Sequence, residues 1–115
     1  MRNTINYWLS WVNKNPSSEY GTTSPRIQEQ LKQSLLIMRT QIDNRGAIIA
    51  ANDSDIMKFN KDTYTYMWPR DGAWVAIAYD RAGYSSVSQR FFRFCAKGIS
   101  QEGYLLHKYN PDLSV

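Results

Sequence analysis

The sequence of 115 residues is poor in the residues that cross-link small proteins or hold metal ions. It contains a single cysteine, Cys95, and a single histidine, His107. One cysteine excludes a disulfide within the chain, and no Cys/His spacing matches a zinc site. We therefore expect no metal and no other cofactor. Because Cys95 closely follows three phenylalanines, we expect it to be a small buried hydrophobe.

Long apolar runs and clusters of charge are also missing. No stretch reaches the length of about 20 residues that a membrane-spanning helix needs, and the N-terminus lacks the pattern of a signal peptide. The net charge is +4, with 14 basic and 10 acidic residues, but the basic residues form no patch. The sequence therefore predicts a cytoplasmic protein with neither a nucleic-acid nor a membrane partner.

Aromatic residues, in contrast, are plentiful. They make up 14% of the chain, with eight Tyr and four Trp. Both residues combine a flat apolar face with a hydrogen-bonding group, which suits binding surfaces, although many such residues simply fill a core. The length fits one domain or a piece of a larger one.

Apolar residues at helical spacing predict two helices in the first half of the chain. The first covers residues 4–14, with Asn3 or Thr4 as its cap, and a polar connector follows at 15–24. The second opens at Ser24-Pro25, the expected order of N-cap and first helical residue. Its apolar positions continue to Ile42, and turn residues at 43–46 end it.

Two further helices are predicted in the second half. One covers residues 71–82, and the residues expected on its apolar face are Trp74, Val75, Ala78 and Ala82. The other covers about 86–97 with Gly98 at its end, and its expected apolar face consists of Val87, Phe91, Phe94 and Cys95. The chain is therefore predicted to be mainly α.

Long connections separate these helices. The connection 43–70 contains a short extended segment at 47–51 and a polar loop at 52–62, and the connection 98–115 is irregular. Loops longer than about a dozen residues are usually functional or disordered. Both connections here are rich in aromatic and turn residues, which favours function.

The segment YTYMWPRD at 64–71 joins aromatic residues to a pair of opposite charges. Arginine offers a fixed fork of donors and an ionised aspartate offers acceptors, so Arg70 and Asp71 could hold two neighbouring hydroxyls of a sugar. Trp68 could lie beneath the apolar face of the ring. The alternative is an ordinary ion pair beside core aromatics at the start of a helix.

This segment resembles the Y-x-Y-x-W-x-R-D motif of glycoside hydrolase family fifteen, which includes glucoamylases and glucodextranase-like and trehalase-like members. Gly46 to Ala51 resembles that family's Gly-Ala-Ile-x-Ala segment, and Gly103 to Asp112 resembles its G-x-L-x-x-K-[FY]-N-x-D loop. The resemblance covers roughly Leu35 to Asp112, whereas residues 1–30 form a helix and linker without a motif. It implies a partial (α/α)6 barrel, with residues 1–115 as one piece of that catalytic domain.

The resemblance also implies roles for individual residues. Arg70 and Asp71 would bind hydroxyls of a terminal glucose in the −1 subsite, and Tyr64 and Trp68 would wall that sugar. Lys108 would contact the sugar or the edge of the site. The partner of the whole enzyme would be an oligosaccharide or polysaccharide of α-linked glucose.

The proton chemistry of such an enzyme would lie elsewhere. An inverting glycosidase needs one carboxylic acid and one carboxylate on opposite sides of the sugar. The glutamates of this chain are Glu19, Glu29 and Glu102, and none falls in a motif of the family. We therefore expect no catalytic residue in this chain, which resembles the front end of such a domain, and no turnover by the 115 residues alone.

The sequence leaves open a second hypothesis of a different class. A truncated helical protein would expose the apolar faces of its helices, and large exposed apolar patches usually find partners. Such a chain would form a homo-oligomer, would not be an enzyme and would bind sugar weakly at most.

Overall fold

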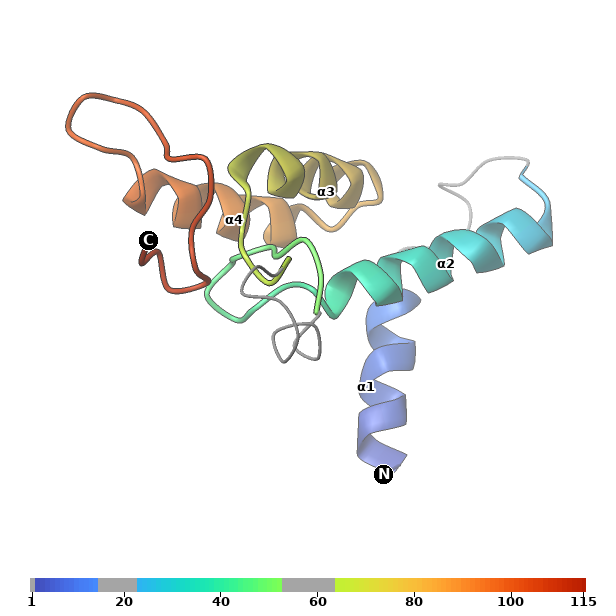
Figure 1. Ribbon diagram of the computed structural model, residues 1–115. Coiled ribbons are helices and arrows are strands. Elements are labelled where there is room, and N and C mark those ends of the chain that lie inside the picture. Colours follow the sequence, from blue (N-terminus) through green and yellow to red (C-terminus); the bar gives the residue numbers. More distant parts are fainter. Residues whose placement is uncertain (1, 15–22, 53–63) are drawn as a thin grey trace. The chain divides into compact units, whose positions relative to one another are not determined.

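The chain is mainly helical. The computed structural model describes residues 2–14, 23–52 and 64–115. These parts of the chain contain four helices in the order α1 (Arg2–Val12), α2 (Pro25–Arg39), α3 (Pro69–Arg81) and α4 (Ser85–Lys97) (Figure 1). Within the same ranges there is no strand, and two isolated β-bridges join Ile42 to Ile48 and Met67 to Tyr109. The prediction of a mainly α fold is confirmed, and the (α/α)6 barrel stays a prediction.

The chain divides into two compact units, residues 1–40 and 41–115. In the first unit α1 packs on α2, and among its described residues Val12 and Leu35 are the buried side chains. Lys32 of α2 donates from Nζ to Oδ1 of Asn13, just after α1, over 2.7 Å. The first helix begins two residues earlier than predicted, at Arg2, and ends at Val12.

Helix α2 begins where the sequence predicts and ends earlier. Ser24 is extended and Pro25 takes the first helical position, as expected. The helix ends at Arg39, because the N–H of Thr40 already bonds back to the carbonyls of Ile37 and Met38. The prediction that Ile42 lies on this helix is wrong, since its backbone forms the bridge to Ile48.

The turn at 43–47 explains the early end of α2, because Ile42 pairs with Ile48 across it and the N–H of Asp43 donates to the carbonyl of Ala47, not to a helical carbonyl. The Oδ1 atom of Asp43 accepts hydrogen bonds from the N–H groups of Arg45, Gly46 and Ala47, at 2.8, 2.8 and 2.9 Å. A side chain that bonds the backbone in this way competes with helix formation. Gly46 has a φ of 109°, and a Cβ there would lie 2.6 Å from the carbonyl oxygen of Arg90. Only glycine fits this position.

Helices α3 and α4 form the core of the second unit and run side by side in opposite directions (Figure 1). Gly72 lets them approach closely, because a Cβ there would lie 2.5 Å from ring atoms of Phe91. The expected apolar face of α4 is confirmed, since Val87, Phe91, Phe94 and Cys95 are all buried. Gly98 caps this helix, with its N–H bonded to the carbonyl of Cys95.

The expected apolar face of α3 is mostly wrong. Trp74 is 71% exposed and Ala78 is also exposed. The buried residues of the helix are Gly72, Ala76 and Tyr79. Because Gly72 contacts Phe91, the helix is oriented so that Ala76 and Tyr79, four and seven residues later, face the core. Of the predicted face only Ala82, at the C-cap, is buried.

Some predictions fall on residues that the structure does not describe. Most of the connector 15–24, including Glu19, and most of the loop 52–62 lie outside the described residues. In the ranges that are described, no helix is long and apolar enough to cross a membrane.

Candidate functional site

The segment from Tyr64 to Met67 lies between two other segments of the second unit. On one side, the N–H groups of Ala50 and Ala51 donate to the carbonyls of Tyr66 and Tyr64, both over 3.1 Å. On the other, Met67 and Tyr109 exchange two backbone hydrogen bonds of 2.8 and 2.9 Å. The segment is therefore held in an extended conformation along both edges.

Extended backbone places alternate side chains on opposite sides. Met67 points inward and is completely buried. Tyr64, Tyr66 and Trp68 share the other side, where the ring of Trp68 lies 6.0 Å from that of Tyr64 and 5.8 Å from that of Tyr66. Tyr64 is 64% exposed. We call these three residues the aromatic face.

The charged pair follows at once, because Pro69 starts α3 directly after Trp68. Arg70 and Asp71 thus lie in the first turn of a helix that begins two residues earlier than predicted, and Asp71 lies near the helix start as predicted. Nη2 of Arg70 is 3.3 Å from Oδ2 of Asp71, and their side chains are 75% and 50% exposed. The helix N-terminus favours a negative charge at Asp71. Both groups remain accessible to a ligand.

The C-terminal connection brings Lys108 to the aromatic face. Its Nζ lies 4.1 Å from the centre of the Tyr66 ring, within the range of a cation–π contact. Tyr66 and Lys108 also line an open pocket of about 440 Å³, together with Leu106, His107, Tyr109, Asn110 and Val115, whereas Tyr64, Trp68, Arg70 and Asp71 are not part of its lining. This volume lies in the range of small-molecule sites.

The hydroxyl of Tyr109 holds this connection in shape. It accepts a hydrogen bond from the N–H of Leu106 over 2.7 Å and donates one to the carbonyl of Gly98 over 3.1 Å. Tyr109 is buried, so it ties the end of α4 to the turn before Lys108.

Among the predicted site residues, Tyr64, Trp68 and Lys108 are linked by contacts with one another or with Tyr66, and Arg70 and Asp71 adjoin them along the chain. Tyr64 and Trp68 are in ring contact, Arg70 and Asp71 follow them, and Lys108 reaches them through Tyr66. Tyr66 was not among the predicted site residues. The alternation of aromatic residues at 64, 66 and 68 is the signal that could have identified it.

The groups of this region suit hydrogen bonding and apolar contact. Arg70 and Lys108 offer donors, Asp71 offers acceptors, and the aromatic face offers an apolar surface. The described glutamates, Glu29 and Glu102, are both exposed, and neither lines the pocket beside Lys108. No group of three His, Cys, Asp or Glu residues that could hold a metal ion is found in the described ranges.

Comparison with known proteins gives one informative similarity. The chain is 30% identical over 109 residues to an uncharacterized glycosyl hydrolase of Methanocaldococcus jannaschii. The match covers 92% of this chain but 17% of the relative, so the chain spans about a sixth of that protein. No protein-family model matches the chain, and no solved structure matches it. The similarity supports a glycosyl hydrolase-like origin and does not distinguish among families of hydrolases.

Proposed function

We propose that this chain supplies the sugar-binding part of an inverting α-glycosidase of glycoside hydrolase family fifteen. The observation that carries the proposal is that the aromatic face ends at Trp68, the N-cap of α3, and that the exposed Arg70–Asp71 pair follows in the first turn of that helix. The similarity to a glycosyl hydrolase supports it.

A pyranose ring matches this arrangement chemically. Its C–H faces are apolar and would pack against Trp68 and Tyr64, while its hydroxyls need donors and acceptors at the rim. Arg70 can donate to one hydroxyl and Asp71 can accept from its neighbour. Lys108, held over Tyr66, would contact the same sugar from the edge of the site.

In this proposal the charged pair binds and does not transfer protons. An inverting mechanism needs two carboxyl groups about 6.5–9.5 Å apart, one protonated and one ionised, across the scissile bond. Asp71 is paired with Arg70, which suits a hydroxyl acceptor better than an acid. The chain alone is therefore expected to bind α-linked glucose oligosaccharides without hydrolysing them.

Sugar binding by the 115-residue chain tests the proposal directly. Maltotriose should shift the indole N–H resonance of Trp68 in NMR spectra, and Asp71→Asn or Arg70→Ala should weaken the affinity about tenfold or more. Tyr104→Phe is the matched control, because Tyr104 is also exposed, at 55%, but belongs neither to the aromatic face nor to the pocket that Lys108 lines. Equal affinities in all four proteins would contradict the proposed site.

Activity can be tested in a longer protein that carries this segment together with a catalytic acid and base. Hydrolysis of maltose, isomaltose or trehalose should fall on the order of 10²-fold in Asp71→Asn, since poor positioning of the sugar has effects of that size. Unchanged rates in that variant would exclude Asp71 from the sugar site.

A second candidate function is self-association without catalysis. Trp74 and Ile77, one turn apart on α3, are 71% and 38% exposed, and contiguous exposed apolar surface favours a partner. In this case the partner would be a second copy of the chain. Sedimentation should then show a homo-oligomer that Trp74→Ser weakens, and a monomer at all concentrations would exclude it.

A further inference from the structure

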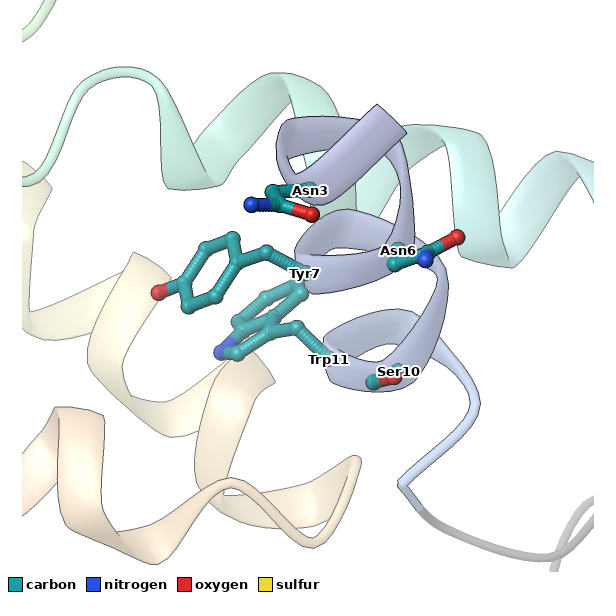
Figure 2. Close-up of a pocket in the computed structure, with 5 residues that line it drawn as sticks. All are labelled: Asn3, Asn6, Tyr7, Ser10 and Trp11. Carbon is teal, nitrogen blue, oxygen red and sulfur yellow. The ribbon is translucent and has the colours of Figure 1, made fainter. Parts of the chain in front are cut away.

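One face of α1, far along the sequence from the site described above, carries side chains of a distinct chemistry. Five residues line a pocket of about 490 Å³, and they are Asn3, Asn6, Tyr7, Ser10 and Trp11. They follow one another at steps of three, one, three and one, so they form a single stripe of the helix. Figure 2 shows the Tyr7 and Trp11 rings on one side of this stripe and Asn6 and Ser10 along the other.

The two rings are held by a third. The ring of Trp8 meets that of Tyr7 edge to face, with centroids 5.3 Å apart, and meets that of Trp11 in the same way at 6.1 Å. The helix itself is fixed to α2 near its end, through the buried Val12 and the bond between Lys32 and Asn13. Tyr7 is nevertheless 54% exposed, so this ordered surface is open to a ligand.

The composition of the stripe restricts the class of ligand. All five side chains are uncharged, so a strongly charged ligand would find no opposite charge there. Three of them are amides or a hydroxyl, which offer both donors and acceptors. An apolar helix laid over them would leave these groups without hydrogen-bond partners, which is costly. A neutral ligand with flat apolar faces and many hydroxyls satisfies every group.

We propose that this face of α1 binds a neutral oligosaccharide. Tyr7 and Trp11 would lie against the C–H faces of one or two sugar rings, and Asn3, Asn6 and Ser10 would bond their hydroxyls. This site is distinct from the aromatic face at Tyr64–Trp68, because it belongs to the other compact unit. It would hold a chain of sugars on the surface and has no part in bond cleavage.

The indole N–H groups of Trp11 and Trp68 report on the two sites separately. The 115-residue chain is labelled with ¹⁵N. Maltoheptaose, cellohexaose and xylohexaose are then added in separate titrations, each up to a sugar concentration of about 10 mM. At least one of these sugars should shift the Trp11 signal in a saturable way. The shift should persist in Trp68→Ala, even if the proposed glycosidase site fails.

Substitutions on α1 separate this face from the rest of the helix. Tyr7→Ala and Asn6→Ala should each weaken binding at Trp11 about fivefold or more. Ile5→Ala and Leu9→Ala are matched controls, since both residues are about as exposed as Tyr7, at 52% and 54%, but lie off the stripe. Asn6→Ala changes an exposed polar side chain on the helix surface and should leave the far-UV CD spectrum unchanged.

Two results would overturn the proposal. One is a Trp11 signal that no sugar of the series shifts. The other is a Trp11 signal that changes with protein concentration and not with sugar, because the face would then bind a second copy of the chain.

Discussion

Met67 and Tyr109 exchange both of their backbone hydrogen bonds, at 2.8 and 2.9 Å, although 42 positions separate them in the sequence. This pair joins the two long connections of the chain. Because Trp68 follows Met67 and Lys108 precedes Tyr109, the pair also determines that the aromatic face and the lysine lie together. The proposed sugar site therefore depends on a contact between loops.

The phenol of Tyr109 is expected to stabilise the connection before Lys108. In Tyr109→Phe the N–H of Leu106 loses its acceptor, and a hydrogen bond of this kind contributes about 1 kcal/mol. The amide of Leu106 should then exchange with solvent deuterium about fivefold faster, as measured by NMR. Tyr104→Phe, in an exposed tyrosine of the same connection, should leave this rate unchanged. An unaltered Leu106 rate in Tyr109→Phe would show that the bond contributes nothing.

Gly72→Ala is expected to destabilise the α3–α4 pair. Alanine is the better helix former by about 1 kcal/mol, but its Cβ would lie 2.5 Å from the ring of Phe91. Crowding of this kind costs about 1–3 kcal/mol, so the free energy of unfolding in urea should fall. Ala78→Gln, at an exposed position of the same helix, should change it by less than about 0.5 kcal/mol.

A second substitution checks that the cause is the ring. Phe91→Leu added to Gly72→Ala removes the ring atoms in closest contact. The free energy of unfolding of the double variant should therefore fall by less than the sum of the decreases in the two single variants. Additive losses would mean that the crowding is relieved in another way.

Asp43→Ala is expected to loosen the turn after α2. Three backbone N–H groups would lose the acceptor that Oδ1 provides. Gly46 keeps a longer bond to the carbonyl of Asp43, but the partly buried N–H of Ala47 would lose this acceptor, and a buried donor without a partner costs about 1–3 kcal/mol. Thermal unfolding followed by CD should show the loss. Asn44→Ala, at the exposed neighbouring position, is the control, and a loss as large as that of Asp43→Ala would argue against the role of Oδ1.

The buried thiol of Cys95 is expected to react slowly. Burial raises its pKa from 9.0 to about 11, so at pH 8 the reactive thiolate should be about 100-fold scarcer than for an ordinary thiol. The rate of reaction with Ellman's reagent should therefore rise steeply when guanidinium unfolds the chain. Equal rates in the folded and unfolded protein would contradict the burial.

The same raised pKa makes the stability of the fold depend on pH. Between pH 9.0 and about 11 the unfolded thiol loses its proton while the folded one keeps it, so this contribution is present below pH 9 and lost as the pH rises to about 11. Cys95→Ala removes the titrating group. Its free energy of unfolding should decline less across that interval than that of the unsubstituted chain.

The sequence predicted the presence of the helices more accurately than the residues at which they end. Ser24-Pro25 marks the start of α2, and the phenylalanines of α4 repeat at helical spacing, so both features depend on neighbouring residues. The end of α2 was placed too late because Ile42 continues the apolar spacing. The backbone of Ile42 instead pairs with Ile48 across the turn that Asp43 holds, and periodicity does not reveal this contact.

The candidate site, too, could be predicted from the sequence only in part. Its residue types and their order, from Tyr64 to Asp71, can be read directly from the chain, and the alternation of aromatics requires only extended backbone. The approach of Lys108 to Tyr66 could not be derived from those residues, because it depends on pairing across two loops. Whether Tyr64, Trp68, Arg70, Asp71 and Lys108 bind sugar remains a prediction.

The sequence by itself determined the helical class, the buried face of α4 and the glycine that ends this helix, because periodicity and capping act over a few residues. Only the tertiary structure decided which face of α3 is buried. The helix has apolar residues on more than one side, and the close contact of Gly72 with Phe91 selects one of them. The result leaves Trp74 on the surface, against the expectation from spacing alone.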